Sequence, residues 1–229
     1  MGLGEIVLED VRFRYPASAG EGFELRVDEL KIAAGERVAC IGPSGSGKTT
    51  LLGLIAGILV PHEGRVVVGG TEVSALGDAR RRRVRIGNIG MVFQEFELLE
   101  YVSALENILV PIRVSAGRRV VAADRQRAKG LAASLGVSHV LGRKPTRLSQ
   151  GERQRIAICR CLVTDPGIIM GDEPTGNLDP ATGETTLDLL FEQAASRGAS
   201  VVIVTHNHGI LDRFDRVIDV RSLHGDGLG

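Results

Sequence analysis

The segment 42–49 limits the possible folds of this chain more than any other part of the sequence. It reads Gly-Pro-Ser-Gly-Ser-Gly-Lys-Thr and matches the pattern G-x-x-x-x-G-K-[ST] at every specified position. Glycines allow backbone N–H groups to turn inward around phosphate oxygens, and a helix that starts there directs its positive end at the same point. An apolar run at 37–41 precedes the segment, and a helical pattern follows it. The segment therefore predicts a phosphate-binding loop between a buried strand and a helix.

Short apolar runs alternate with helical patterns in much of the chain. Runs at 89–93, 168–170 and 201–204 are continuously apolar, which is typical of parallel strands covered on both faces. The clearest helical pattern covers 180–197, which begins with proline, follows an aspartate cap and ends before a glycine. This alternation predicts an α/β fold with a mostly parallel sheet.

Residues 5–15 and 23–32 show a different pattern, because polar and apolar side chains alternate along them. Such alternation is typical of strands with one buried face. We expect the two segments to pair as an antiparallel hairpin, which forms a β subdomain at the N-terminus.

Residues 95 to about 163 interrupt the alternation of strands and helices. Helical patterns lie at 105–114, with Pro111 inside, and at 124–135, and another helix begins near Ser149. We interpret this stretch as an α-helical subdomain inserted into the α/β core.

Residues suited to nucleotide chemistry follow four of the predicted strands. Gly42 opens the glycine-rich loop, and Gln94 and His206 each follow an apolar strand directly. Asp172 and Glu173 end the run that begins at 168. Open α/β sheets bind ligands along the edge that the carboxyl ends of their strands form. One nucleotide site therefore explains the four positions better than four unrelated loops do.

Each of these side chains has chemistry that such a site can use. Lys48 can reach the β- and γ-phosphates, and the Thr49 hydroxyl and the Asp172 carboxylate can ligate Mg²⁺. Glu173 can polarise an attacking water, provided that it lies within hydrogen-bond reach of the proton. His206 can hydrogen-bond both the γ-phosphate and Glu173.

The segment 148–152, Leu-Ser-Gln-Gly-Glu, opens a helix and has two interpretations. It is a capping box, with Ser149 as the cap and Glu152 three residues later. It is also an exposed helix N-terminus, which binds anions, and the two interpretations are compatible. Because this segment lies in the helical subdomain, a phosphate that it recognises would belong to the nucleotide of a second protomer.

Together these residues resemble the nucleotide-binding subunit of ABC transporters, and the resemblance covers essentially the whole chain. Segment 42–50 resembles the Walker A loop, and segment 148–152 resembles the ABC signature. Segment 177–179, Asn-Leu-Asp, is similar to the D-loop. The signature is the motif that distinguishes this family from other P-loop ATPases.

The resemblance implies a domain organisation. The chain would be a single ABC ATPase domain, 1–229, with a P-loop NTPase (RecA-like) fold. Residues 1–94 and 164–229 would form the ATP-binding α/β core, and residues 95–163 the helical subdomain with the signature.

The resemblance also implies ATP and Mg²⁺ as cofactors and roles for individual residues. Tyr15 looks like the aromatic residue that stacks on adenine. The residues implied in catalysis are Lys48, Gln94, Glu173 and His206. The residues implied in binding are Tyr15, Gly42, Ser44, Gly45, Ser46, Gly47, Lys48, Thr49, Thr50, Ser149 and Gly151 for ATP, and Thr49, Gln94 and Asp172 for Mg²⁺.

Two residues depart from the family's signature, Leu-Ser-Gly-Gly-Gln. Gln150 stands in place of the first glycine, and Glu152 in place of the glutamine. Binding requires the Gln150 side chain to point away from the opposing phosphate. Glu152 adds negative charge near an anion unless its own helix cap engages it.

Segments 172–179 and 90–99 resemble the bacterial branch that includes lipoprotein-releasing, macrolide-exporting and cell-division ATPases. This implies an ATP-binding and ATP-hydrolysing subunit that energises an ABC transporter, of export or lipoprotein-release type, through nucleotide-driven dimerisation. The alternative is a regulatory or mechanical ATPase coupled to a membrane partner without transport, as in cell division. A DNA- or ribosome-associated ABC protein is disfavoured, because such proteins usually carry a coiled-coil insert or duplicated cassettes.

Composition agrees with this assignment. The 28 basic and 28 acidic side chains cancel, so we expect no nucleic-acid partner.

No apolar stretch approaches the ~20 residues of a membrane span, and no secretory signal is visible. Three cysteines, an odd number, fit a reducing cytosol, where we expect buried thiols. We predict a cytoplasmic protein, peripheral on the cytoplasmic face of the membrane, that binds an integral membrane permease and a second copy of itself.

Two further surface features each have two interpretations. Phe96, Leu98, Leu99 and Tyr101 either line a groove for a helix of the membrane partner or belong to the core of the subdomain. The arginines at 80–83 and 85 are interpreted as a solvated helix face rather than as a site for nucleic acid or lipid headgroups.

Overall fold

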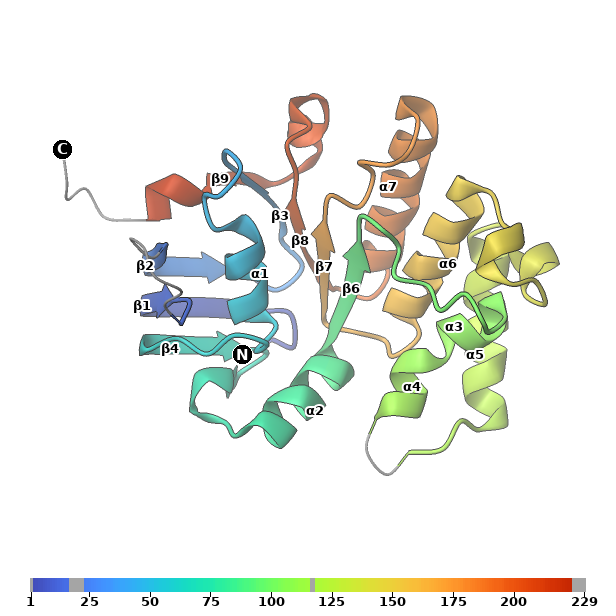
Figure 1. The fold of residues 1–229 in the computed structure, drawn as a ribbon, viewed down its shortest axis with the longest axis horizontal. Coiled ribbons are helices and arrows are strands. Elements are labelled where there is room, and N and C mark those ends of the chain that lie inside the picture. The colour runs from blue at the N-terminus through green and yellow to red at the C-terminus, as the bar shows by residue number, and fades with distance from the viewer. Residues whose placement is uncertain (1, 17–22, 116–117, 224–229) are drawn as a thin grey trace.

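A five-stranded parallel sheet lies at the centre of the computed structural model, which describes residues 2–16, 23–115 and 118–223 (Figure 1). Its strands bring together segments that are far apart in the sequence, and each neighbouring pair is parallel. This confirms the predicted α/β fold of the P-loop NTPase type. Across the sheet the order is β6 (Ile89–Phe93), β7 (Ile168–Asp172), β8 (Ser200–Val204), β3 (Arg37–Ile41) and β9 (Arg216–Asp219).

The N-terminal β subdomain is larger than the predicted hairpin. Two additional strands extend it into a four-stranded antiparallel sheet. The added strands were missed because the first half of β4 is exposed and β5 has only two residues, so neither shows a sustained alternation. The order is β2 (Glu24–Ile32), β1 (Ile6–Arg14), β4 (Glu63–Val68) and β5 (Thr71–Glu72).

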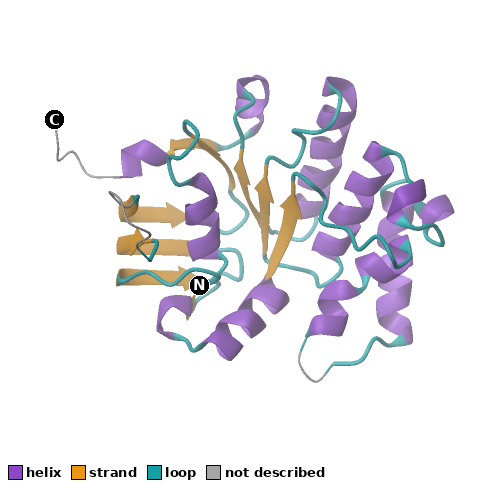
Figure 2. Ribbon diagram, viewed as in Figure 1, coloured by secondary structure: helices purple, strands orange, loops and turns teal. Residues whose placement is uncertain are grey.

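Both faces of the parallel sheet are covered, as its apolar runs predicted. Val201 and Ile203 of β8 belong to a hydrophobic cluster that includes the helices α6 (Gln150–Leu162) and α7 (Pro180–Ala195). Val202 and Val204 belong to a second cluster, which includes α1 (Lys48–Ile55) and the antiparallel sheet. Figure 2 shows α1 and the pair α6 and α7 on opposite sides of the parallel strands. Successive residues of a strand point to opposite faces, so a strand between two clusters is apolar throughout.

The described residues between β6 and β7 contain helices and no strand, as predicted. The helices α3 (Ala104–Ile108) and α5 (Ala122–Ser134) both pack against α6. Two details of the prediction are wrong. The expected helix at 105–114 is divided at Leu109, because Pro111 lacks the N–H needed inside a helix and stands instead in the first turn of the second helix. The next helix begins at Ala122, two residues before Asp124. The helices are α3 (Ala104–Ile108), α4 (Val110–Val114) and α5 (Ala122–Ser134).

The three cysteines are buried and none forms a disulfide, as predicted. Cys40 lies on β3, and Cys159 and Cys161 lie on α6. Burial raises the pKa of each thiol to about 12. The cysteines are therefore protonated core residues at neutral pH.

Asn107 anchors the segment that leaves β6 to helix α3. The side chain is fully buried. Its Nδ2 donates to the carbonyl oxygens of Leu99, at 3.0 Å, and Ser103, at 3.1 Å, and its Oδ1 accepts from the Leu99 N–H at 2.7 Å. This one amide therefore fixes the path of the backbone after Gln94.

We predict that Asn107→Ala lowers the free energy of unfolding by about 2–3 kcal/mol, because buried backbone groups at Leu99 lose their partners. Urea unfolding followed by circular dichroism would measure the change. Gln126→Ala, at an exposed position on α5, is the control and should change stability by less than about 0.5 kcal/mol. An equal effect of the two substitutions would contradict the anchoring role of Asn107.

Candidate functional site

The glycine-rich loop joins β3 to α1 with a backbone that requires its glycines. Gly42 and Gly47 have φ angles of +150° and +95°, in a region that other residues rarely adopt. A Cβ at Gly42 would lie 2.6 Å from Ser46 Oγ, and one at Gly47 would lie 2.7 Å from Phe23 Cζ. Ser46 Oγ is itself buried without a hydrogen-bond partner among the described residues. A tight loop that requires glycine and holds an unpaired buried hydroxyl fits phosphate binding.

Lys48 reaches back across this loop. Its Nζ donates to the carbonyl oxygens of Gly42, at 2.7 Å, and Pro43, at 2.8 Å. The ammonium group therefore lies over the loop, where it can exchange these carbonyls for phosphate oxygens.

Thr49 and Asp172 are brought together from α1 and β7. The Thr49 hydroxyl donates to Asp172 Oδ2 at 3.1 Å. A hydroxyl and a carboxylate are the hard oxygen ligands that Mg²⁺ prefers, and Mg²⁺ usually takes the rest of its ligands from phosphates and water. The pair therefore fits the predicted metal position. Asp172 is the last residue of β7, in agreement with the predicted strand that ends in the two carboxylates.

Glu173 and His206 also lie in contact. His206 Nδ1 hydrogen-bonds Glu173 Oε1 at 2.7 Å, and the Thr205 hydroxyl donates to Glu173 Oε2 at 3.4 Å. The Glu173 side chain is only 13% exposed, whereas that of His206 is 73% exposed. Glu173 has a φ of +48°, which non-glycine residues rarely adopt, and its N–H donates to the Val204 carbonyl at 3.0 Å. The carboxylate is therefore held in one orientation beside the exposed imidazole.

Gln94 does not face the pair formed by Thr49 and Asp172. It follows β6, whose last residue, Phe93, is paired with Asp172. Its side chain, however, donates to Asn177 Oδ1 at 3.4 Å, and Asn177 Nδ2 donates to the Gln94 carbonyl at 3.0 Å. The structure thus joins Gln94 to the segment 177–179.

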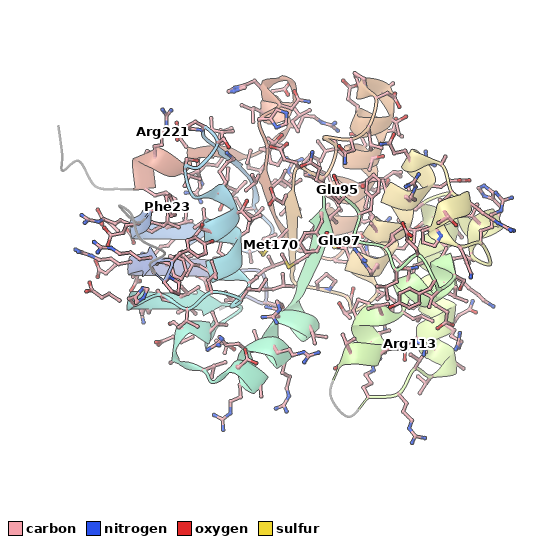
Figure 3. The ribbon with its side chains drawn as sticks, in the orientation of Figure 1. Phe23, Glu95, Glu97, Arg113, Met170 and Arg221 are labelled. Atoms are coloured by element: carbon pink, nitrogen blue, oxygen red, sulfur yellow. The ribbon has the colours of Figure 1, made fainter. Side chains whose placement is uncertain are left out.

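A hollow of about 350 Å³ lies beside the loop, lined by Tyr15 and Phe23. Tyr15 is 49% exposed and hydrogen-bonds Thr50 Oγ1 at 3.1 Å. The two rings have centroids 6.5 Å apart and are tilted by 40°. Phe23, labelled in Figure 3, packs on Gly47 and was missed by sequence reasoning. The sequence did contain a signal for this role. Phe23 is an aromatic residue directly before β2, and the first buried residue of that strand is Leu25.

Ser149 and Gly151 lie away from this group, at the start of α6. Ser149 Oγ accepts from the Glu152 N–H at 3.2 Å, and the Ser149 N–H donates to Glu152 Oε2 at 2.7 Å. The predicted capping box is thus formed, and it engages the Glu152 carboxylate. His139 hydrogen-bonds the other carboxylate oxygen at 3.1 Å. Gln150, beside this box, is exposed. Figure 1 shows α6 and α1 on opposite sides of the parallel sheet.

The apolar cluster predicted after Gln94 is divided. Phe96 is 6% exposed and Leu98 packs, partly buried, against the cluster that includes α6 and α7, whereas Tyr101 is 72% exposed. Arg160, which is half-buried, donates to the carbonyl oxygens of Phe96, at 2.6 Å, and of Glu97, and Phe96 and Glu97 both have positive φ angles. A groove lined by the whole cluster is therefore ruled out, because Phe96 faces inward.

The arginine run lies on α2 (Asp78–Asn88), a helix with no buried residue. Arg81 and Arg85 donate to backbone carbonyls at Leu76 and at 56–57. Arg80 and the pair 82–83 are exposed. The predicted solvated helix face is confirmed for Arg80, Arg82 and Arg83, whereas Arg81 and Arg85 are partly buried against the backbone.

Known proteins resemble this chain along most of its length. A family model described as ABC transporter matches residues 25–176. The lipoprotein-releasing system ATP-binding protein LolD of Xanthomonas oryzae pv. oryzae is 45% identical over 194 residues, which are 85% of this chain and 79% of that protein. LolD of Pseudomonas fluorescens is 43% identical over 196 residues, which are 86% of each chain.

Solved structures share the fold. One is described as the dimeric post-hydrolysis state of the ATP-binding cassette MJ0796 bound to ADP and Pi; it is 34% identical, covers 93% of both chains and has a TM-score of 0.84. Another, a dimeric structure of MJ0796 described as a bacterial ABC transporter cassette, is 35% identical with a TM-score of 0.83.

We predict that Glu152→Ala lowers the free energy of unfolding by about 1 kcal/mol at pH 7, through loss of the capping box. The hydrogen bond from the Ser149 N–H is the largest of the interactions that hold the pKa of Glu152 below its ordinary value. A lowered pKa means that the stabilisation is complete above the unfolded-state pKa, about 4.3, and is lost as the pH falls through the folded-state value. The difference in unfolding free energy between the wild type and Glu152→Ala, measured by urea unfolding, should therefore be smaller below pH 4.5 than at pH 7. Glu192→Ala, on the exposed face of α7, is the control, and a pH-independent difference for Glu152 would contradict the prediction.

Proposed function

We propose that this chain, which belongs to the ABC transporter family, is the ATPase subunit of a membrane complex that releases lipoproteins. The family makes it an ATP-binding and ATP-hydrolysing protein with Mg²⁺ as the accompanying ion. Relatives at 43–45% identity are named as the ATP-binding protein of a lipoprotein-releasing system, which favours release over the alternative of a mechanical ATPase in cell division.

The observation that carries this proposal is the grouping at the carboxyl edge of the parallel sheet. The glycine-rich loop follows β3, the Thr49–Asp172 pair joins α1 to β7, and the Glu173–His206 pair joins the ends of β7 and β8. Ligands bind along this edge in open α/β sheets.

Each residue of the group has a role that its contacts support. Lys48 and the N–H groups of the loop would bind the phosphates, together with Ser44, Gly45, Ser46 and Thr50. Thr49 and Asp172 would hold Mg²⁺, which neutralises developing charge on the phosphates when it is bound. Gln94 would join them only after leaving Asn177.

Glu173 and His206 would act on the reacting groups. The oriented Glu173 carboxylate would accept a proton from the attacking water, and a base must lie within hydrogen-bond reach of that proton. His206, exposed beside it, would keep Glu173 in place and donate to the γ-phosphate. Tyr15, and with it Phe23, would form the surface on which the adenine stacks.

A second copy of the chain would complete the site. Ser149 and Gly151 begin an exposed helix N-terminus in the helical subdomain, 95–163, and no described contact joins them to the glycine-rich loop. The structural relatives are described as dimeric cassettes. In such a dimer, each ATP would lie between the loop of one protomer and the signature of the other.

Replacement of Glu173 tests the proposal. We predict that Glu173→Gln lowers ATP hydrolysis by about a hundredfold or more, while ATP binding is retained and an ATP-dependent dimer accumulates. Phosphate release and size-exclusion chromatography with light scattering would measure the two effects. Glu192→Gln is the matched control. Hydrolysis at the wild-type rate, or a variant that stays monomeric with saturating ATP, would refute the proposed role.

The segment after Gln94 supports a membrane partner. No helix among the described residues is long and apolar enough to cross a membrane. The name of the relatives, the ATP-binding protein of a releasing system, supports a permease that would be a separate chain, with this chain on the cytoplasmic face of the membrane. Tyr101 is the most exposed aromatic side chain described, and Glu95, Glu97 and Glu100 beside it are exposed. Figure 3 shows Glu95 and Glu97 beyond the carboxyl end of β6. We infer that this acidic and aromatic surface binds the permease.

We predict that Tyr101→Glu abolishes stimulation of the ATPase by co-expressed permease, because the aromatic contact is replaced by a charge, and that it leaves ATP binding unchanged. The measurement is ATPase activity of the purified complex and of the isolated subunit. Val121→Glu, an exposed apolar position on the same subdomain, is the control. Full stimulation of a folded Tyr101→Glu subunit would contradict this assignment.

A further inference from the structure

A buried amide links helix α6 to the turn that carries Glu173. Gln154 lies about one turn after Ser149 on α6 and is 0% exposed. Its Nε2 donates to the carbonyl oxygen of Pro174, for which no other donor occurs among the described residues. The opposite atom, Oε1, is buried without a partner. Burial of a polar side chain with one unpaired atom lowers stability. The hydrogen bond to Pro174 is therefore the one interaction that accounts for an amide at this position.

The turn that Gln154 contacts combines one internal bond, from the Gly176 N–H to the Glu173 carbonyl at 3.0 Å, with support from outside. Glu173 adopts a left-handed φ of +48°, which is unfavourable for a residue with a side chain. Pro174 has no N–H, so the turn has one donor fewer with which to stabilise itself. Pro174 also packs closely on Gly171, where a Cβ would lie 3.0 Å from its Cγ. From outside the turn, the Val204 carbonyl therefore holds the Glu173 N–H, and the Gln154 amide holds the carbonyl of the next residue, Pro174.

We propose that Gln154 is a positioning residue for Glu173, which ties the signature helix to the carboxylate that activates water. The inference rests on the proposed function. In the dimer, the first turn of α6 faces the ATP of the partner, whereas Glu173 acts on the ATP bound by its own chain. Helix α6 thus contacts the partner's ATP through Ser149. About one turn later, the same helix orients, through Gln154, the Glu173 carboxylate that acts on the ATP of its own chain. The two ATP sites are connected through a single buried hydrogen bond in each protomer.

Gln154→Met is the direct test, because methionine has a similar length and no N–H to donate. We expect kcat for ATP hydrolysis to fall about tenfold with KM changed by less than about twofold, since ground-state binding does not involve Gln154. Thr186→Val is the matched control: Thr186 is a buried residue of α7 whose hydroxyl also lacks a partner, and its replacement should leave kcat unchanged. A wild-type kcat for Gln154→Met would overturn the proposal.

A mixed dimer separates positioning from general damage to α6. One protomer keeps Glu173 and the other carries Glu173→Gln, so that only the first cleaves its ATP. Gln154→Met in the first protomer should reduce turnover, whereas the same substitution in the second, which presents only its signature to the active ATP, should leave turnover unchanged. Equal loss from both placements, loss only from the second, or no loss from either would overturn the proposal. Failure of the proposed function appears separately, as the absence of an ATP-dependent Glu173→Gln dimer, and overturns the inference with it.

Discussion

The burial of the parallel sheet on both faces is the constraint on which the rest of the structure depends. Each apolar side chain removed from water contributes about 1.5–3 kcal/mol, and strands such as β8 place successive residues into two different clusters. The register between strands is therefore fixed from both sides, and the carboxyl ends are held at one edge. Loops that leave this edge can adopt unfavourable backbone angles, as Glu173 does, because the sheet determines where they begin.

The polar groups at this edge are largely satisfied by one another. Lys48 bonds to loop carbonyls, Thr49 to Asp172, Gln94 to Asn177 and Glu173 to His206. Nucleotide binding would therefore exchange hydrogen bonds more than add them, and its net free energy would be smaller than a count of new contacts suggests. The same exchange would give ATP a mechanical effect under the proposed function, because Gln94 and Asn177 belong to segments that lead to the helical subdomain and to α7.

Sequence patterns predicted the parts of the fold that repeat, and the motifs predicted which side chains meet at the carboxyl edge, such as Thr49 with Asp172 and Glu173 with His206. Continuous apolar runs identified β3, β6, β7 and β8, since burial on both faces leaves no polar position. The strand β9 was missed, because Arg216–Asp219 contains only two apolar residues and is recognisable only beside β3. Contacts between distant segments were equally out of reach. Nothing in the spacing of Phe23 and Gly47, or of Gln154 and Pro174, indicates that they touch.

Burial within one short segment was also unpredictable. Phe96 and Tyr101 are both aromatic and five residues apart, yet one is core and the other is exposed. The difference follows from the positive φ angles at Phe96 and Glu97 and from Arg160, which comes from α6 and binds their carbonyls. Such a conformation is set by a tertiary contact and has no local signature.

The burial of all three cysteines makes the unmodified chain a suitable background for thiol chemistry. Cys40, Cys159 and Cys161 are inaccessible, and their raised pKa values leave almost no thiolate at neutral pH. A cysteine introduced at an exposed position of the folded protein would then be the only one to react with a maleimide. Spin labels or fluorophores placed in this way could report the distance between two copies of the chain without first replacing native residues in the core.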